Sequence, residues 1–432
     1  MSDEIAPIPR PKTGGRAGAS ATMAEAMAAL ADCRRIYVTG GCGAPSALVE
    51  GLAAERQRWD RLEIVADYLL APLAIFDHPG EPFHLLSLQP SRAVDGMRAA
   101  NALSNVSSSL RHFAKLTRSD GPLSIDAALV HVSPPGPDGR FSLGASVGTP
   151  VEVMANAPLV IAQVNPQMPY TFGAAELDRD EIDLLVDVDH ALVELPASSV
   201  DATAEQIGSL VAAEIPDHSV IQFGVGAIPK AVLDSLHNHR DLGVHGGMIG
   251  DEVAALYASG ALTGRAKPTW PGKMVVGAVL GGRTAFEFAD RNPDLLMVPA
   301  SISHGPTALG ALDRFVAINS AVEVALDGSI NAETAAGRVL SGPGGQPDYL
   351  IGAAEAAHGI SIIALPSTGG RDGGRSRIVS ALDTGTSVTG LRSFADLVIT
   401  EHGVARLKGR SFAERAEALK AIADPQHQES LE

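Results

Sequence analysis

Arg35-Ile-Tyr-Val-Thr-Gly-Gly-Cys-Gly-Ala-Pro45 joins a short apolar run to a turn dense in glycine, and residues 46–52 after it have a helical pattern. The same order returns in His218-Ser-Val-Ile-Gln-Phe-Gly-Val-Gly-Ala-Ile-Pro229, which also precedes a helical pattern. A strand followed by a tight turn and a helix is the repeating unit of parallel α/β structure. The two copies therefore predict two tandem, related α/β lobes with mainly parallel sheets.

Later segments of the two halves also correspond in order. Residues 125–132 and 317–324 are apolar runs typical of buried strands, and residues 159–164 correspond in the same way to residues 360–365. Duplication of one α/β unit accounts for this order. The alternative is that strand–turn–helix units recur in every α/β protein without any duplication.

The length of the chain fits two domains rather than one. A chain of 432 residues exceeds what a single hydrophobic core usually serves. The strand–helix pattern breaks in Glu194-Leu-Pro-Ala-Ser-Ser199, and a new helical pattern follows. We therefore divide the chain into a flexible tail at 1–21, an N-terminal lobe at 22–199 and a C-terminal lobe at 200–432 that carries most of the site.

Composition narrows the classes of partner. The net charge is −17, whereas a nucleic-acid-binding protein needs a basic face for the phosphates. No stretch reaches the roughly 18 apolar residues of a membrane span, and the polar residues 1–18 do not form a signal peptide. The two cysteines, Cys33 and Cys42, lack zinc-binding spacing. We expect a cytoplasmic homo-oligomer without a metal, a nucleic-acid partner or a membrane.

Two glycine-rich turns are candidates for binding an anion or an oxyanion. Gly224-Val-Gly226 lies between a predicted strand and a predicted helix, where backbone amides point at a ligand. It lacks the third glycine of a dinucleotide fingerprint, so NAD is not indicated, and a structural turn is the alternative. The glycines of Ser341-Gly-Pro-Gly-Gly-Gln-Pro-Asp348 permit a close approach of a ligand to the backbone, and a plain loop is the alternative.

Gly243-Val-His-Gly-Gly-Met-Ile-Gly-Asp-Glu-Val253 combines glycines with groups that transfer protons. His245, Asp251 and Glu252 are the catalytic candidates, although a single histidine is often structural. The arginines of residues 367–377 would either grip phosphates or belong to a solvated loop, and both interpretations stay open. The sequence contains no serine nucleophile elbow, Walker loop or His/Cys metal cluster.

Taken together, these stretches resemble the acetyl-CoA hydrolase/CoA-transferase family, which includes acetate and 4-hydroxybutyrate CoA-transferases. The resemblance covers nearly the whole chain after the tail. Besides the glycine turns, it is carried by Ile125-Asp-Ala-Ala-Leu-Val-His-Val-Ser-Pro-Pro135, Val164-Asn-Pro-Gln-Met-Pro169, Ile318-Asn-Ser-Ala-Val-Glu-Val324 and Thr400-Glu-His-Gly-Val-Ala405.

The resemblance implies two CoA-transferase lobes, an acyl-CoA substrate, a role in acetate metabolism and, for a transferase, a small carboxylic acid as second substrate. In the family a glutamate carboxylate attacks the thioester carbonyl, and backbone amides stabilise the oxyanion. The residues implied to bind CoA or the oxyanion are Gln222, Gly224, Gly226, Asn319, Gly342, Gly344, Gly345, Gln346 and Asp348. The implied acyl pocket consists of Met168, Tyr170 and Met248.

Two departures concern the reaction itself. The family reads His-x-Glu-Met with the glutamate as nucleophile, whereas this chain reads His245-Gly-Gly-Met248, so Gly247 stands at the glutamate position. Tyr170 stands where relatives often have arginine. We therefore favour water-dependent cleavage of an acyl-CoA, by thioester hydrolysis or by retro-Claisen hydrolysis of a C–C bond, with His245, Glu252 or another carboxylate activating the water. The alternatives are CoA transfer through a displaced nucleophile such as Glu252, and acyl-CoA binding without catalysis.

Overall fold

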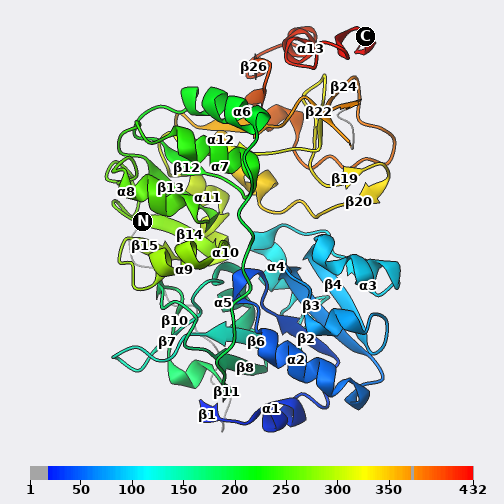
Figure 1. Ribbon diagram of the computed structural model, residues 1–432, viewed down its shortest axis with the longest axis vertical. Helices are drawn as coiled ribbons and strands as arrows, with labels where there is room; N and C mark the ends of the chain where they lie inside the picture. Colours follow the sequence, from blue (N-terminus) through cyan, green and yellow to red (C-terminus); the bar gives the residue numbers. More distant parts are fainter. Residues whose placement is uncertain (1–17, 371–373, 432) are drawn as a thin grey trace. The chain divides into compact units, whose positions relative to one another are not determined.

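The computed structural model describes residues 18–370 and 374–431 (Figure 1). Most of the expected tail at residues 1–21, and Arg371 of the arginine-rich loop, lie outside the described residues. The chain divides into two compact units: the first comprises Met1–Pro196 and Val275–Ser303, the second Ala197–Met274 and His304–Glu432. The chain passes from the first unit to the second after Pro196, close to the expected boundary at residue 199. No pattern in the sequence signals that residues 275–303 return to the first unit.

An eight-stranded sheet forms the centre of the first unit, and all its neighbouring strands are parallel. Every residue of β6 is buried, and apolar side chains of the central strands pack against α1 and α2. Buried apolar strands are typical of a parallel sheet covered by helices. In spatial order the strands are β1 (Ala19–Ser20), β11 (Leu184–Asp187), β8 (Leu159–Val164), β6 (Ala127–Val132), β2 (Arg35–Val38), β3 (Leu62–Tyr68), β4 (Phe83–Gln89) and β5 (Leu103–Asn105).

The first helix, α1 (Met23–Ala29), starts after Thr22, and Thr22 is its N-cap. The Thr22 side chain accepts a hydrogen bond from the Glu25 amide at 3.3 Å, and Glu25 accepts one from the Thr22 amide at 2.8 Å. Such a capping box satisfies two amides at the helix start. The helices and short strands of this unit are α1 (Met23–Ala29), α2 (Ser46–Ala54), α3 (Asp95–Ala99), α4 (Leu110–Leu116), α5 (Gly148–Met154), α9 (Arg283–Ala289), α10 (Ala300–Ser303), β7 (Phe141–Ser142), β9 (Phe172–Gly173), β10 (Glu176–Leu177), β14 (Met274–Val279) and β15 (Leu295–Met297).

The sheet of the second unit repeats the strand order of the first. Its strands are parallel except for the edge strand β26, and their order is β26 (Gly403–Arg406), β25 (Leu397–Thr400), β21 (Ile360–Ala364), β16 (Phe315–Asn319), β12 (Val220–Gln222) and β13 (Gly243–Ile249). The order β25-β21-β16-β12-β13 corresponds strand by strand to β11-β8-β6-β2-β3 of the first unit. The predicted fold of two α/β lobes with mainly parallel sheets is confirmed, and the shared order favours duplication.

Strand β13 was not expected from the sequence. Glycine is depleted in strands, and residues 243, 246, 247 and 250 are all glycines. Its backbone pairs in parallel register with β12, with Val220 opposite Gly243 and Ile221 opposite Val244. The ladder therefore forms although several positions of the strand carry no side chain.

Helices and short strands complete the second unit. Helices α6 and α7 pack closely, because a Cβ atom at Gly208 would lie only 2.6 Å from the backbone carbon of Ala231. The elements are α6 (Ala202–Ala213), α7 (Ala227–Ser235), α8 (Glu252–Ala258), α11 (Pro306–Gly310), α12 (Gln346–Glu355), α13 (Phe412–Ala421), β17 (Glu323–Ala325), β18 (Ile330–Asn331), β19 (Thr334–Ala335), β20 (Arg338–Val339), β22 (Thr368–Gly369), β23 (Arg375–Ser376) and β24 (Ile378–Val379).

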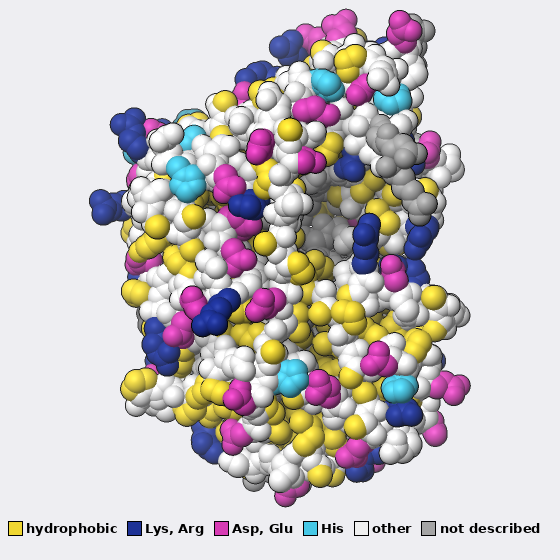
Figure 2. Space-filling view, in the orientation of Figure 1, with side chains coloured by type: hydrophobic (Ala, Val, Ile, Leu, Met, Phe, Trp, Pro, Cys, Tyr) yellow, Lys and Arg dark blue, Asp and Glu magenta, His cyan; other side chains and the backbone are white. Residues whose placement is uncertain are grey.

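The surface carries charges of both signs. Figure 2 shows acidic side chains standing beside basic ones over the visible face. Among residues 18–370 and 374–431, no helix is both long and apolar enough to cross a membrane. The same residues contain no cluster of three or more His, Cys, Asp or Glu side chains arranged to hold a metal ion.

Candidate active site

The strands of the second unit bring several expected site residues to one edge of the sheet. Gln222 is the last residue of β12 and Asn319 the last residue of β16. The Asn319 side-chain amide donates a hydrogen bond to the Gln222 side-chain oxygen at 3.1 Å. A Cβ atom at Gly246 would lie 3.0 Å from Cγ of Gln222, so β13 also reaches this place. Ligands of parallel α/β sheets characteristically bind at this carboxyl edge.

Helix α12 starts at the same edge. Gln346, its first residue, donates from Nε2 to the backbone oxygen of Ser320 at 2.7 Å, directly after the end of β16. Gly344 has a φ of +59°, which favours glycine, and Gly345 is the N-cap of the helix. Asp348 is buried in the first turn, where a negative charge is stabilised by the helix dipole. The expected cradle of amides thus consists of the turn before α12 and the start of this helix.

The turn between β12 and α7 is open. A Cβ atom at Gly224 or at Gly226 would have no atom within 4 Å among the described residues. Gly226 has a φ of +121°, so its backbone angle, not crowding, favours glycine there. The backbone of this turn is accessible to a ligand, as a role in binding requires.

Position 247, which the resemblance assigns to the nucleophilic glutamate, is crowded by two side chains. A Cβ atom at Gly247 would lie 2.8 Å from the Tyr349 hydroxyl oxygen and 3.0 Å from Nε2 of His304. Real Cβ contacts essentially never fall below 3.0 Å. A glutamate could stand here only if both rings moved.

The two rings that face Gly247 are packed against each other. His304 lies between α10 and α11, and Tyr349 lies in the first turns of α12. Their ring centroids are 4.8 Å apart and their planes are tilted by 33°. A Cβ atom at Gly345 would lie 2.5 Å from Cδ2 of His304 and 2.6 Å from Cε2 of Tyr349. The pair therefore lies between the backbones of two glycines, Gly247 and Gly345.

Tyr349 carries a deeply buried hydroxyl group. The side chain is 3% exposed, and within the described residues its hydroxyl oxygen has no hydrogen-bond partner. Burying such a group costs about 1–3 kcal/mol. Burial raises the pKa of the Tyr349 phenol well above its ordinary value, and the nearby Asp348 adds to this rise. The phenol therefore stays protonated and can donate a hydrogen bond.

The acid–base candidates from the sequence occupy different surroundings. His245 on β13 is fully buried, and its ring centroid lies 5.9 Å from that of Trp270. Glu252 is the first residue of α8, and Asp251 precedes it as the N-cap. The atoms nearest to a Cβ at Gly247 belong to Tyr349 and His304 rather than to these three. Catalytic roles for His245, Asp251 and Glu252 stay predictions.

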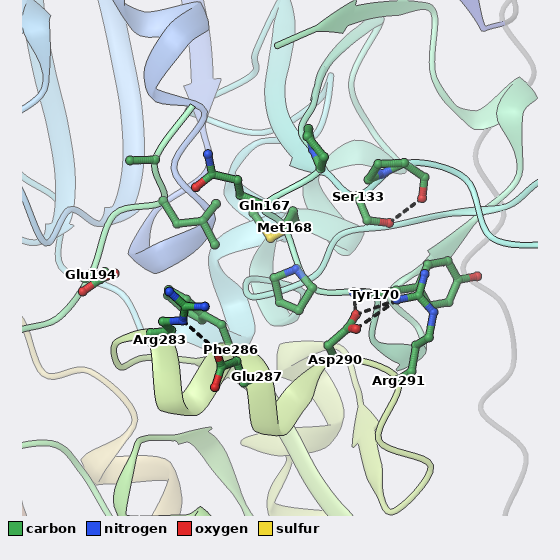
Figure 3. Close-up of a pocket in the computed structure, with 15 residues that line it drawn as sticks. Ser133, Gln167, Met168, Tyr170, Glu194, Arg283, Phe286, Glu287, Asp290 and Arg291 are labelled. Atoms are coloured by element: carbon green, nitrogen blue, oxygen red, sulfur yellow. Dashed lines mark hydrogen bonds and ion pairs between the residues drawn. The ribbon is translucent and has the colours of Figure 1, made fainter. Parts of the chain in front are cut away.

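Two of the expected acyl-pocket residues line a pocket in the first unit (Figure 3). Its volume is about 510 Å³, and Met168, Tyr170 and Phe286 contribute apolar surface. Arg283 pairs with Glu287 at 2.6 Å on the same wall. Met248, the third expected residue, belongs to β13 of the second unit. An acyl-binding role for these residues stays a prediction.

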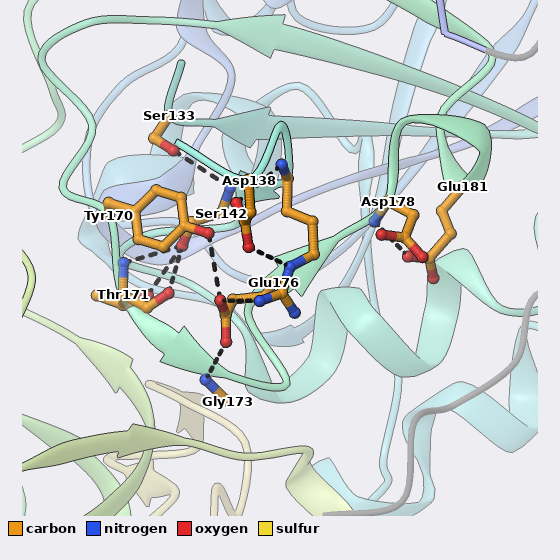
Figure 4. Close-up of polar contacts among 10 residues, drawn as sticks. Ser133, Asp138, Ser142, Tyr170, Thr171, Gly173, Glu176, Asp178 and Glu181 are labelled. Carbon is orange, nitrogen blue, oxygen red and sulfur yellow. Dashed lines mark hydrogen bonds and ion pairs between the residues drawn. The ribbon is translucent and has the colours of Figure 1, made fainter. Parts of the chain in front are cut away.

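Tyr170 is held by a polar network (Figure 4). Its hydroxyl donates to Glu176 at 3.2 Å, and Glu176 also pairs with Arg140 at 3.0 Å. Burial and the neighbouring Glu176 carboxylate raise the pKa of Tyr170 to about 12. The guanidinium of Arg291 lies 5.6 Å from the centre of the ring. Tyr170 is therefore fixed in place as a neutral phenol.

The arginine-rich loop has charge partners within the protein. Arg375 reaches Glu323 at 3.4 Å and Asp383 at 3.6 Å. Burial lowers the pKa of Arg377, while Glu401 acts in the opposite direction. A phosphate-binding role of the loop stays a prediction.

His304 and Tyr349 were not selected from the sequence. His304 lies in an ordinary loop pattern, and Tyr349 lies in an apolar helical stretch where an aromatic residue indicates core packing. Only the tertiary contact with Gly247 distinguishes them, and no spacing in the sequence encodes this contact.

Two family models match separate parts of the chain. Residues 97–193 match the acetyl-CoA hydrolase/transferase N-terminal domain, and residues 281–432 match the C-terminal domain of the same name. The chain is 40% identical to the 4-hydroxybutyrate coenzyme A transferase of Clostridium kluyveri over 72% of each chain. It is 27% identical to the acetyl-CoA hydrolase of Neurospora crassa over 68% of this chain and 62% of that protein.

The crystal structure of RipA from Yersinia pestis has the same fold, with a TM-score of 0.89 and 27% identity over 96% of each chain. The chain therefore belongs to the acetyl-CoA hydrolase/transferase family. This membership confirms the resemblance read from the sequence and the expectation of an enzyme. Its named relatives include both transferases and hydrolases, so they do not decide between the two reactions.

Proposed function

We propose that this protein hydrolyses the thioester of an acyl-CoA with water as the attacking group. The observation that carries the proposal is the close contact at Gly247. The position that the resemblance assigns to the attacking glutamate carries no side chain, and the polar ends of His304 and Tyr349 lie within 3.0 Å of the place of its Cβ. A covalent relay through a carboxylate at this position is therefore closed to this chain.

The surroundings of Gly247 support acyl-CoA as the substrate. The accessible glycine turn at 224–226 and the start of α12 present backbone amides, which stabilise the oxyanion formed when a thioester carbonyl is attacked. Relatives named for coenzyme A transfer and for acetyl-CoA hydrolysis agree with such a substrate. A cytoplasmic homo-oligomer remains the expected form of the protein.

CoA transfer is the second candidate. It is favoured by the 40% identity to a named transferase and would use a small carboxylic acid as acceptor. Since Gly247 cannot react, Glu252 would be the nucleophile. This residue follows the end of β13 and opens α8, whereas effective attack requires reacting atoms about 3–3.5 Å apart. For this reason we rank transfer below hydrolysis.

One assay separates the two reactions. The protein is incubated with a panel of acyl-CoAs, with and without acetate, while free thiol and product mass are measured. Hydrolysis predicts free CoA and free acid without acetate and an unchanged rate with it. If acyl-CoA is lost only in the presence of acetate and acetyl-CoA is formed, the protein is a CoA-transferase and the proposed hydrolysis is wrong. Binding of the panel without turnover would leave only an acyl-CoA-binding role.

A further inference from the structure

We propose that His304 and Tyr349 are the catalytic pair of this site: His304 activates the attacking water, and Tyr349 donates a hydrogen bond to the thioester oxygen. This inference rests on the proposed hydrolysis and deepens it, because it names the groups that act in place of the missing carboxylate. Neither residue lies in residues 243–253, the stretch that the resemblance assigns to the family's nucleophile.

The pair faces the position where the reaction of the family is centred. A Cβ atom at Gly247 would lie 2.8 Å from the Tyr349 hydroxyl and 3.0 Å from Nε2 of His304, so both polar atoms are directed at the same small volume. A proton acceptor and a proton donor that converge on one point match the needs of water attack on a carbonyl.

Glycine backbone lies on both sides of this buried pair. Gly247 and Gly345 are only partly buried, whereas His304 is 6% and Tyr349 3% exposed. In the proposed reaction the thioester lies against this glycine backbone, next to the two rings. The backbone of Gly345, the N-cap of α12, is close to the same rings.

The hydroxyl group of Tyr349 is the observation that points to a ligand. A phenylalanine would fill the same place beside His304 without burying a polar atom. The Tyr349 hydroxyl is instead retained with no partner among the described residues, and it is directed at Gly247. A ligand oxygen at this position would accept its hydrogen bond, since its raised pKa keeps the phenol protonated.

The reaction then balances without a cofactor. Nε2 of His304 takes a proton from water as the water oxygen bonds to the thioester carbon, and the carbonyl π electrons move to the oxygen. The Tyr349 hydroxyl stabilises this oxyanion. When the carbonyl re-forms, the C–S bond breaks with its electron pair on sulfur, and the proton on His304 passes to the thiolate. The products are one carboxylic acid and one CoA thiol.

Two substitutions test the pair. Tyr349→Phe removes only the hydroxyl and is expected to lower kcat for acyl-CoA hydrolysis about 10²–10³-fold, as loss of an oxyanion donor does. His304→Gln keeps the side chain polar and is expected to lower kcat about 10²–10⁴-fold. It should also remove the fall of kcat at acidic pH that protonation of a histidine base produces. Binding of a thioether analogue, which lacks the reacting carbonyl, should change no more than a few-fold in either variant.

Matched controls are Tyr37→Phe, which trims a buried phenol on β2 of the first unit, and His358→Gln, which removes an exposed histidine paired with Asp313. Both should keep the parental kcat.

Parental kcat in Tyr349→Phe or an unchanged pH profile in His304→Gln would overturn the catalytic pair while leaving hydrolysis intact. If Tyr349→Phe or His304→Gln has a lower melting temperature than the parent, the kinetics of the other variant test the catalytic pair. A parent protein that does not hydrolyse any acyl-CoA without acetate would overturn both proposals.

Discussion

At the scale of single residues, Gly247 and Gly345 act on the same pair of aromatic rings. Each of them would place a Cβ atom within 3.0 Å of His304 or Tyr349, so each must be glycine for the pair to stay where it is. Position 247, which the resemblance assigns to the nucleophilic glutamate, is thus bordered by two polar rings.

Gly247→Glu is expected to destabilise the protein rather than to create a transferase. Overpacking of a tight site costs about 1–3 kcal/mol, and the free energy of unfolding should fall by this amount. Thermal melting and an acetate-dependent transfer assay measure the two effects. Gly96→Ala is the control, because a Cβ atom at Gly96 meets nothing within 4 Å. A Gly247→Glu protein with parental melting and new transfer activity would contradict the account of position 247.

Lys267 leads to a prediction about pH. Its side chain is 4% exposed and donates hydrogen bonds to the backbone oxygens of Val244 at 2.9 Å and Lys273 at 2.6 Å. Burial lowers its pKa to about 7 from an ordinary value of 10.5. Between these values the unfolded chain binds the proton and the folded protein does not. The stability that this residue contributes therefore rises with pH across this window, by at most about 1.4 kcal/mol per pH unit.

The comparison of the parent with Lys267→Met isolates this effect. The difference in free energy of unfolding, parent minus variant, should increase from pH 7 to pH 10 and level off below pH 7. Chemical denaturation at several pH values measures it. A difference that stays constant with pH would show that Lys267 keeps its ordinary pKa in the folded protein.

At the scale of elements, the contact of α6 with α7 depends on one small residue. A Cβ atom at Gly208 would lie 2.6 Å from the backbone carbon of Ala231, and backbone cannot turn aside as a flexible side chain does. Gly208→Ala should therefore lower the free energy of unfolding by about 1–3 kcal/mol, although alanine is the better helix former. Ser209→Ala, on the exposed side of α6, is the control and should be neutral or slightly stabilising. Gly208→Ala with parental stability would mean that the two helices separate at little cost.

The elements differ in how far the sequence predicts them. Apolar runs predict β6, β8, β12 and β21, because a buried parallel strand needs such side chains on both faces. Strand β13 escapes prediction because its register is held by backbone pairing with β12 while glycines replace the diagnostic side chains. Helix α12 begins at Gln346, whose side chain donates a hydrogen bond to the Ser320 backbone oxygen, a contact that no sequence pattern indicates.

At the scale of the whole molecule, the shared strand order of the two units expresses the repeat already visible in the glycine turns. The return of Val275–Ser303 to the first unit has no counterpart in the sequence pattern, since unit membership depends on contacts far apart in the chain. The candidate site shows the same contrast between local sequence patterns and distant contacts. Residues on the glycine turns could be predicted from motifs, whereas His304 and Tyr349 meet only through packing.

The most direct test of water attack at this site is a single turnover in 18O-enriched water, with the protein in excess over acyl-CoA and no acceptor acid present. Direct attack predicts that the released acid carries one 18O from the first turnover and that the protein carboxylates stay unlabelled. Mass spectrometry of the acid and of the peptide containing Glu252 measures both. An unlabelled acid together with 18O in a protein carboxylate would contradict the account, because that pattern requires a covalent intermediate on the protein.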